Sequence, residues 1–387
     1  MTPGARVQAA IEIVDDLINN RFQVEKTLKI WARQNRYAGS KDREEIRDLV
    51  FDALRNLRSY AGSGGGMNGR AIISASLYFK GICLAQVFTG KGYAPAPLEN
   101  VVFNELDILK DAEKYDLPDW LWPIWLNNLG EKAENSAMVL KERANLFLRV
   151  NLLKVTRKEA IISLAEQGID AEIHPKVETA LIVKRGQKRI RHSNIYQNGM
   201  IELQDASSQM TVCALPKNLS GPFLDYCAGG GGKALALAAK FNTKIIAHDA
   251  VNQRMFDIAS RSSRAGAEIE IVSTNNLKNR DFGLVLADTP CSGSGTWRRD
   301  PAGKWLLTET ALRHLVKTQK DIIKRSSQYV RDGGILAYVT CSVLKSENCD
   351  QIDAFLSSEK NWTVQDYNQF YPSDCGDGFY YCYLRKE

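Results

Sequence analysis

Long hydrophobic runs are absent from this sequence of 387 residues: no stretch approaches the roughly 18 uncharged apolar residues that a membrane-spanning helix requires. The N-terminal segment also lacks the basic residues and following apolar run that mark an export signal. The eight cysteines form no CxxC pair and no metal-type spacing with the four histidines. We therefore expect a cytoplasmic protein without a membrane contact and without a bound metal.

The overall composition excludes several non-globular classes. Hydrophobic residues make up 44% of the chain and charged residues 25%. These are ordinary values for a globular protein, and they disfavour whole-chain disorder, collagen-like repeats and coiled coil. At roughly 100 to 200 residues per domain, the length predicts two or three domains.

Three segments of the chain have different patterns. Residues 1–140 repeat apolar side chains at helical spacing, which predicts an all-helical domain. In residues 141–200, two strand-like runs flank a helix with a Thr156 and Glu159 capping box, which predicts a small α+β module. Residues 201–387 alternate short apolar strands with helices, as a doubly wound α/β sheet requires.

The net charge of +6 is concentrated in one of these segments. Residues 141–200 carry 12 Lys and Arg against 6 Asp and Glu, whereas the charges on either side nearly balance. Five of these basic residues lie in KRGQKRIRH (Lys184–His192). Such a patch indicates contact with a polyanion, with nucleic acid the leading candidate, although a solvated basic turn has the same pattern.

A glycine loop follows the first predicted strand of the third segment. The loop is CAGGGGK (Cys227–Lys233), and the second strand ends on Asp249. Glycines allow a ligand to approach the backbone, and an acid at the end of the second strand typically binds ribose hydroxyls. Asp225, just before the loop, would repel a pyrophosphate but suits a cation such as the ammonium of S-adenosylmethionine. The loop alone favours a methyltransferase only slightly over a dehydrogenase.

Two cysteine motifs end later strands of the same predicted sheet. DTPCSGSGT (Asp288–Thr296) follows the fourth strand, and the fifth ends in YVTCS with Cys341. If these two strands are neighbours, Cys291 and Cys341 reach the same crevice, at the edge where parallel sheets bind ligands. Carbon 5 of a pyrimidine becomes nucleophilic after addition at carbon 6, and a thiolate suits that reversible addition. The pattern therefore predicts pyrimidine methylation.

Four ordered motifs carry a resemblance to a known family. CAGGGGK, DTPCSGSGT, YVTCSVLKSEN and the terminal DGFYYC resemble the RNA cytosine-5 methyltransferases of the bacterial RsmB type and the NOL1/NOP2/Sun group. The resemblance covers residues 145–387 and, more faintly, the N-terminal helices. It implies a NusB-like helical domain at 1–140, an RRM-like module at 141–200 and a Rossmann-like methyltransferase domain at 201–387. It further implies an S-adenosylmethionine-dependent enzyme that acts on RNA, with ribosomal RNA favoured, and we expect a monomer.

The same resemblance assigns roles to individual residues. Cys341 would be the nucleophile, Cys291 would assist product release, Asp288 would contact the cytosine and Lys233 would orient the base. The cofactor contacts would come from these residues: Cys227, Ala228, Gly229, Gly230, Gly231, Gly232, Lys233, Asp249, Arg254, Asn275 and Asp288. The family loop is usually CAAPGGK, so Gly230 stands here in place of proline. Asn275 stands in place of an aspartate, although an amide oxygen still accepts a hydrogen bond from adenine.

Several alternatives remain open at this point. Transfer RNA is a possible substrate in place of ribosomal RNA. The chain is also compatible with a non-catalytic RNA-binding ribosome assembly factor that has a degenerate methyltransferase fold. A dinucleotide-dependent oxidoreductase would leave the paired cysteine motifs unexplained. A DNA cytosine methyltransferase is disfavoured. Such enzymes place the nucleophile in the PC motif, which here contains Cys291, and they need no second thiol in a TCS motif, which here contains Cys341.

Overall fold

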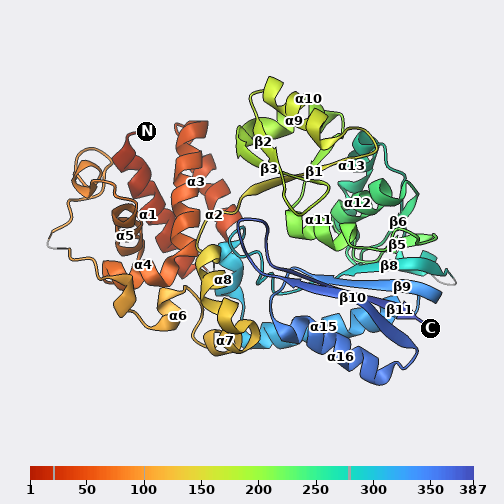
Figure 1. Cartoon of the computed structure of the whole chain (residues 1–387). Coiled ribbons are helices and arrows are strands. Elements are labelled where there is room, and N and C mark those ends of the chain that lie inside the picture. Colours follow the sequence, from red (N-terminus) through yellow and green to blue (C-terminus); the bar gives the residue numbers. More distant parts are fainter. Residues whose placement is uncertain (21, 100, 278–279) are drawn as a thin grey trace. The chain divides into compact units, whose positions relative to one another are not determined.

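The computed structural model describes residues 1–20, 22–99, 101–277 and 280–387, and it divides into two compact units (Figure 1). The first unit comprises residues 1–143 together with 297–309, and the second comprises residues 144–296 with 310–387. The predicted division into 1–140, 141–200 and 201–387 stays a prediction. In the structure, residues 144–200 fall in the same unit as most of the third segment. The segment 297–309, which follows the DTPCSGSGT motif, belongs to the helical unit.

The first unit is a helical bundle around one hydrophobic core. Val14, Val50 and Ile72 are fully buried in this core, at the helical spacing that the sequence shows. The helices are α1 (Pro3–Asn19), α2 (Val24–Gln34), α3 (Ser40–Arg55), α4 (Leu57–Gly64), α5 (Gly69–Phe79), α6 (Asp111–Lys114), α7 (Trp122–Leu129), α8 (Ala133–Leu140) and α14 (Pro301–Leu306).

The segment 297–309 packs on the C-terminal end of α3. The last carbonyls of a helix have no partner within the helix and need donors from elsewhere. Trp305 Nε1 donates to Leu54 O at 2.8 Å, and Lys304 Nζ donates to Arg55 O at 2.9 Å. In return, Arg55 Nε donates to Arg298 O at 2.7 Å. The end of α3 is therefore capped by side chains some 250 residues away in sequence.

The second unit begins with a small four-stranded antiparallel sheet of order β2-β3-β1-β4. Its strands are β1 (Leu146–Val150), β2 (Asp170–Ile173), β3 (Ala180–Arg185) and β4 (Ile201–Leu203), with α9 (Arg157–Glu166) between β1 and β2. The predicted capping box of Thr156 and Glu159 is present at the start of α9. The sequence predicts β1 and β3 but misses β2 and β4. Strand β2 is largely exposed and therefore lacks the apolar run that marks a buried strand.

A mixed sheet of order β10-β11-β9-β8-β5-β6-β7 forms the rest of the second unit. The five strands from β9 to β7 in this order pair in parallel, whereas β11 pairs antiparallel with β9 and β10. The strands are β5 (Phe223–Asp225), β6 (Ile245–Ala247), β7 (Ile269–Ile271), β8 (Phe282–Asp288), β9 (Val330–Thr340), β10 (Trp362–Phe370) and β11 (Phe379–Lys386). The sequence misses β10 because this edge strand is largely exposed and has no apolar run.

Helices cover both faces of this sheet (Figure 1). Apolar residues of α11 (Ala206–Cys213) and α12 (Gly232–Phe241) pack on one face, and those of α15 (Glu309–Ser327) and α16 (Cys349–Ser358) pack on the other. The unit also contains α10 (Asn194–Gln197) and α13 (Ile258–Ala265). The predicted fold class is confirmed: a helical N-terminal region, a small α+β module and an α/β sheet with helices on both faces.

Within the described part of the chain, no helix combines the length and hydropathy that crossing a membrane requires. The same residues contain no group of three or more His, Cys, Asp and Glu side chains placed to hold a metal ion.

Lys304 gives the helical unit a testable pH dependence. Burial lowers the pKa of its ammonium group to about 7, although the charge of Asp116 opposes this shift. Above pH 7 the unfolded chain therefore binds more protons at this lysine than the folded chain does. The free energy of unfolding should rise by about 1–3 kcal/mol between pH 7 and pH 9 through this group.

Denaturant unfolding of the wild type and Lys304→Met at a series of pH values would measure this effect. The Lys304→Met chain should lack this rise, whereas substitution of exposed Lys41 by Met should retain it. Parallel pH profiles for the wild type and Lys304→Met would contradict the prediction.

Candidate active site

The carboxyl ends of the parallel strands bring the predicted site residues to one edge of the sheet. In the register of β5, Asp225 pairs with Ala247 of β6 and with Leu286 of β8. Asp288, at the end of β8, pairs with Val339 of β9. The predicted adjacency of the fourth and fifth strands is therefore confirmed, and this edge is where open α/β sheets bind ligands.

The two motif cysteines lie side by side at this edge. The sulfur atoms of Cys291 and Cys341 are 3.2 Å apart, and both side chains are half-buried. The hydrogen bond between the two thiols and burial raise the pKa of Cys291 well above its usual range. Cys291 therefore remains protonated at neutral pH and can act as a donor toward the sulfur of Cys341.

A buried carboxylate that the sequence reasoning missed lies beneath the thiols. Glu347 is fully buried and accepts hydrogen bonds from the hydroxyl groups of Ser292 and Ser342, both at 2.5 Å. It also accepts from Ser292 N at 2.8 Å and from Gln319 Nε2 at 2.9 Å. Because each serine directly follows one of the cysteines, Glu347 ties the two cysteine loops together. The available signal was the position of Glu347 inside the motif YVTCSVLKSEN.

Lys233 and Asp288 form an ion pair next to the thiols. Lys233 Nζ lies 2.7 Å from Asp288 Oδ2 and 5.3 Å from the centre of the Phe379 ring. The lysine side chain is 8% exposed and the aspartate side chain 33%. The pair thus places a carboxylate with accessible surface, held by a buried cation, at the edge that carries both cysteines.

The glycine loop adopts a conformation that needs glycine at two positions. Gly229 and Gly231 have φ values of +49° and +79°, which other residues rarely adopt. Asp249 accepts hydrogen bonds from Gly229 N at 3.0 Å and from Val251 N at 2.9 Å. Arg254 Nη1 lies 3.3 Å from the same carboxylate. The end of β6 therefore fixes the start of the loop.

Asp225 supplies the clearest electrostatic signal of a missing cation. Its carboxylate is fully buried, and neither oxygen has a hydrogen-bond partner within normal limits among the described residues. Burial raises the pKa of Asp225 to about 7, with a further increase from the charge of Asp288. Burial also raises the pKa of the neighbouring Cys227 thiol. An ammonium group would compensate the buried Asp225 carboxylate, so these residues fit the amino-acid end of S-adenosylmethionine.

Asn275 lies further from the centre of this cluster. It is exposed in the short 3-10 helix η6 (Thr274–Leu277), after β7. The adjacent Thr274 Oγ1 lies 2.9 Å from His248 Nε2, which connects η6 to the end of β6. The chain thus places Asn275 beside the segment that carries Asp249.

The predicted basic patch lies in the small module, and part of it is neutralised. Lys184 and Arg185 form ion pairs with Glu172 at 2.7 Å and Asp170 at 3.3 Å. The remaining basic residues of the patch lie on the 3-10 helix η4 (Gln187–His192). Fewer uncompensated charges are therefore present than the sequence count suggests.

Comparisons with known proteins agree with this geometry. A family model of 16S rRNA methyltransferases RsmB/F matches residues 212–385, and a model of the ferredoxin-like domain of RsmF/B-like methyltransferases matches residues 117–188. The ribosomal RNA small subunit methyltransferase B of Proteus mirabilis is 30% identical over 73% of this chain and 70% of its own length.

Two solved structures share the fold. The protein titled PH0851 has a TM-score of 0.75 and 21% identity, over 100% of this chain and 99% of its own. NSun6 from Pyrococcus horikoshii, solved with SFG, has a TM-score of 0.61 and 18% identity, over 70% of this chain and 98% of its own. The match to the Proteus mirabilis protein, with which the RsmB/F family model agrees, shows that the chain belongs to the RsmB/F family of S-adenosylmethionine-dependent RNA cytosine methyltransferases.

Proposed function

We propose that this chain methylates carbon 5 of cytosine in ribosomal RNA through a covalent adduct between Cys341 and carbon 6. The observation that carries the proposal is the 3.2 Å separation of two thiols at the sheet edge, next to the Lys233–Asp288 pair. Two relatives are named as methyltransferases of small-subunit ribosomal RNA, and these names support ribosomal RNA as the substrate.

Addition to the base is the first chemical step. After its proton has passed to solvent, Cys341 Sγ forms a bond to carbon 6, and the electron pair of the carbon 5–carbon 6 double bond becomes available at carbon 5. Ring atom N3, where the adduct gathers negative charge, takes a proton from solvent. The Asp288 carboxylate accepts a hydrogen bond from N3–H, and Lys233 fixes the position of that carboxylate.

The other half of the site would hold the cofactor. When bound, S-adenosylmethionine would supply the electrophilic methyl group. Asp225 would pair with the ammonium group of its amino-acid end, and Asp249 would accept hydrogen bonds from the ribose hydroxyls. The backbone of the glycine loop from Cys227 to Lys233 allows the close approach, while Arg254 and Asn275 border the nucleoside end.

Release restores the aromatic base. The proton on carbon 5 and the proton held at N3 pass to solvent, and the carbon 5–carbon 6 double bond forms again. The bond between Cys341 and carbon 6 breaks, and its electron pair returns to Cys341 Sγ. Cys291, 3.2 Å from Cys341 and protonated at neutral pH, assists this elimination. Attack and release are therefore separate tasks of two adjacent thiols.

Bisulfite sequencing of RNA from a strain that lacks this chain tests the reaction and its substrate together. We expect one or a few cytosines of small-subunit ribosomal RNA to lose their methyl mark, and the chain to restore it. Loss of a mark in transfer RNA alone would favour the alternative substrate. An unchanged RNA pattern would support the non-catalytic assembly factor and contradict the proposal.

The division of labour between the cysteines predicts opposite outcomes for two variants. Cys341→Ala should bind RNA and S-adenosylmethionine but form no adduct and transfer no methyl group. Cys291→Ala should still attack and methylate but remain bonded to the product, as a protein–RNA species that survives denaturing electrophoresis. The double variant should give no such species, since nothing is attacked. A trapped Cys341→Ala with a free Cys291→Ala would reverse the two roles.

The buried Asp225 predicts how cofactor affinity depends on pH. Below pH 7 the Asp225 carboxyl group of the free protein is protonated, and pairing with the ammonium group requires that proton to leave. The Kd for S-adenosylmethionine should therefore rise as the pH falls from 7 to 5.5, approaching about tenfold per pH unit.

Isothermal titration calorimetry across this range measures both the Kd and the proton release. Asp225→Asn should bind more weakly at pH 7 and lose this pH dependence. Asp249→Asn should also bind more weakly but keep the slope, because it leaves the Asp225 carboxylate in place. A flat profile for the wild type would show that Asp225 does not face the ammonium group.

A further inference from the structure

The glycine loop of this chain needs an external constraint. It contains four consecutive glycines, Gly229 to Gly232, and Gly230 stands where the family pattern has proline. Glycine has the largest backbone freedom of any residue, so ordering such a loop around a ligand costs more than ordering a loop with a proline ring. Cofactor affinity would suffer unless other residues hold the loop.

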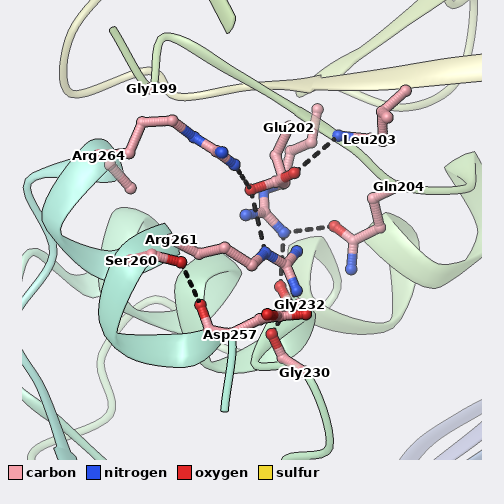
Figure 2. A network of polar contacts seen from close by, with 12 residues as sticks. Gly199, Glu202, Leu203, Gln204, Gly230, Gly232, Asp257, Ser260, Arg261 and Arg264 are labelled. Carbon is pink, nitrogen blue, oxygen red and sulfur yellow. Dashed lines mark hydrogen bonds and ion pairs between the residues drawn. The ribbon is translucent and has the colours of Figure 1, made fainter. Parts of the chain in front are cut away.

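Two arginines bind the loop from outside the cofactor site, as Figure 2 shows for Arg261. Arg261 of α13 donates through Nη1 to Gly230 O. Arg149 of β1 donates through Nη1 to Gly232 O at 2.7 Å. The carbonyls before and after Gly231 are therefore both fixed by charged donors, which form stronger hydrogen bonds than neutral ones.

The small module fixes the directions of these guanidinium groups. Glu202 of β4 accepts from Arg261 Nε at 3.3 Å and from Arg264 Nη2 at 2.7 Å (Figure 2). Arg149 is buried, also donates to the Gln204 side chain, and has its pKa lowered to about 10 by burial. Buried, paired side chains of this kind have little rotational freedom, so they present fixed donors to the loop.

We propose that Arg261 and Arg149 are positioning residues for S-adenosylmethionine: they hold the Gly230 and Gly232 carbonyls in place of the constraint that a proline ring gives the family loop. The inference rests on the proposed cofactor site. It assigns the small module a second task beside any contact with RNA, because β1 and β4 supply Arg149 and Glu202.

Arg264 provides a matched control for Arg261. Both arginines lie on α13 and both bind Glu202, but only Arg261 donates to the loop. Arg261→Ala should raise the Kd for S-adenosylmethionine about tenfold, the usual cost of losing a charged hydrogen bond. Arg264→Ala should raise it less than about threefold. The KM for RNA should change equally in the two variants. Arg264→Ala should lower the Tm at least as much as Arg261→Ala, because it also loses the contact of Arg264 with the Tyr196 ring, 4.2 Å away.

A substitution at Gly230 distinguishes positioning from a general structural role. The φ of Gly230 lies outside the left-handed region, so alanine fits its backbone. In the wild type a Cβ there would lie 3.2 Å from Arg261 Nη1, which is a crowded contact, so Gly230→Ala should not improve affinity. In Arg261→Ala that obstacle is gone. The added Gly230→Ala should then recover roughly two- to fivefold in Kd, since alanine restricts the free loop.

Calorimetry on the full chain, with S-adenosylmethionine as the probe, decides between the outcomes. Failure of the wild type to bind would refute the proposed cofactor site itself. If the wild type binds, two results would overturn the positioning role of Arg261. One is an equal loss of affinity in Arg261→Ala and Arg264→Ala, and the other is no recovery of affinity when Gly230→Ala is added to Arg261→Ala. If Arg261→Ala does not fold, Arg261→Lys keeps the ion pair with Glu202 and should still bind more weakly. The rate of backbone amide hydrogen exchange at residues 228–232 should increase in the Arg261 variants but not in Arg264→Ala.

Discussion

The parallel pairing of β8 with β9 is the constraint on which the candidate site depends. Neighbouring strands lie about 4.8 Å apart, and the register that opposes Asp288 to Val339 ends both strands at the same level. The loops that leave these ends then have no room to separate. Cys291 and Cys341, 50 residues apart in sequence, meet at 3.2 Å for this reason. A different strand order would have left two unrelated buried cysteines.

The buried Glu347 holds the loops of Cys291 and Cys341 together. A fully buried carboxylate is costly unless hydrogen bonds replace its hydration. Here four donors from Ser292, Ser342 and Gln319 do so, and two of the donating residues directly follow the cysteines. All four hydrogen bonds to Glu347 form only when both cysteine loops are in place, so the network restricts the motion of the two thiols. The proposed chemistry requires such rigidity, because attack and release use sulfur atoms at fixed separation.

The cofactor half of the site depends on a different kind of support. The four consecutive glycines of the loop have no side chains to pack. The shape of the loop is set by hydrogen bonds to Asp249 and from Arg149 and Arg261. Two of the supporting residues, Arg149 and Glu202, belong to the small module that also carries the basic patch. The two roles are compatible because they use different parts of the module: strands β1 and β4 for the loop, and the end of β3 with η4 for the basic residues.

The sequence by itself determined the α/β class, the strands of the large sheet other than β10, and the identity of the cysteine, glycine and acidic motifs. These features depend on local periodicity and on residues at strand ends, which are visible within short windows. The adjacency of the thiols followed only on the condition that β8 and β9 are neighbours. Only the tertiary structure showed that Glu347 joins the two cysteine loops, that arginines contact the glycine loop, and that residues 297–309 belong to the helical unit. Each of these joins side chains far apart in sequence, and hydrogen bonds between distant side chains leave no periodic trace along the chain.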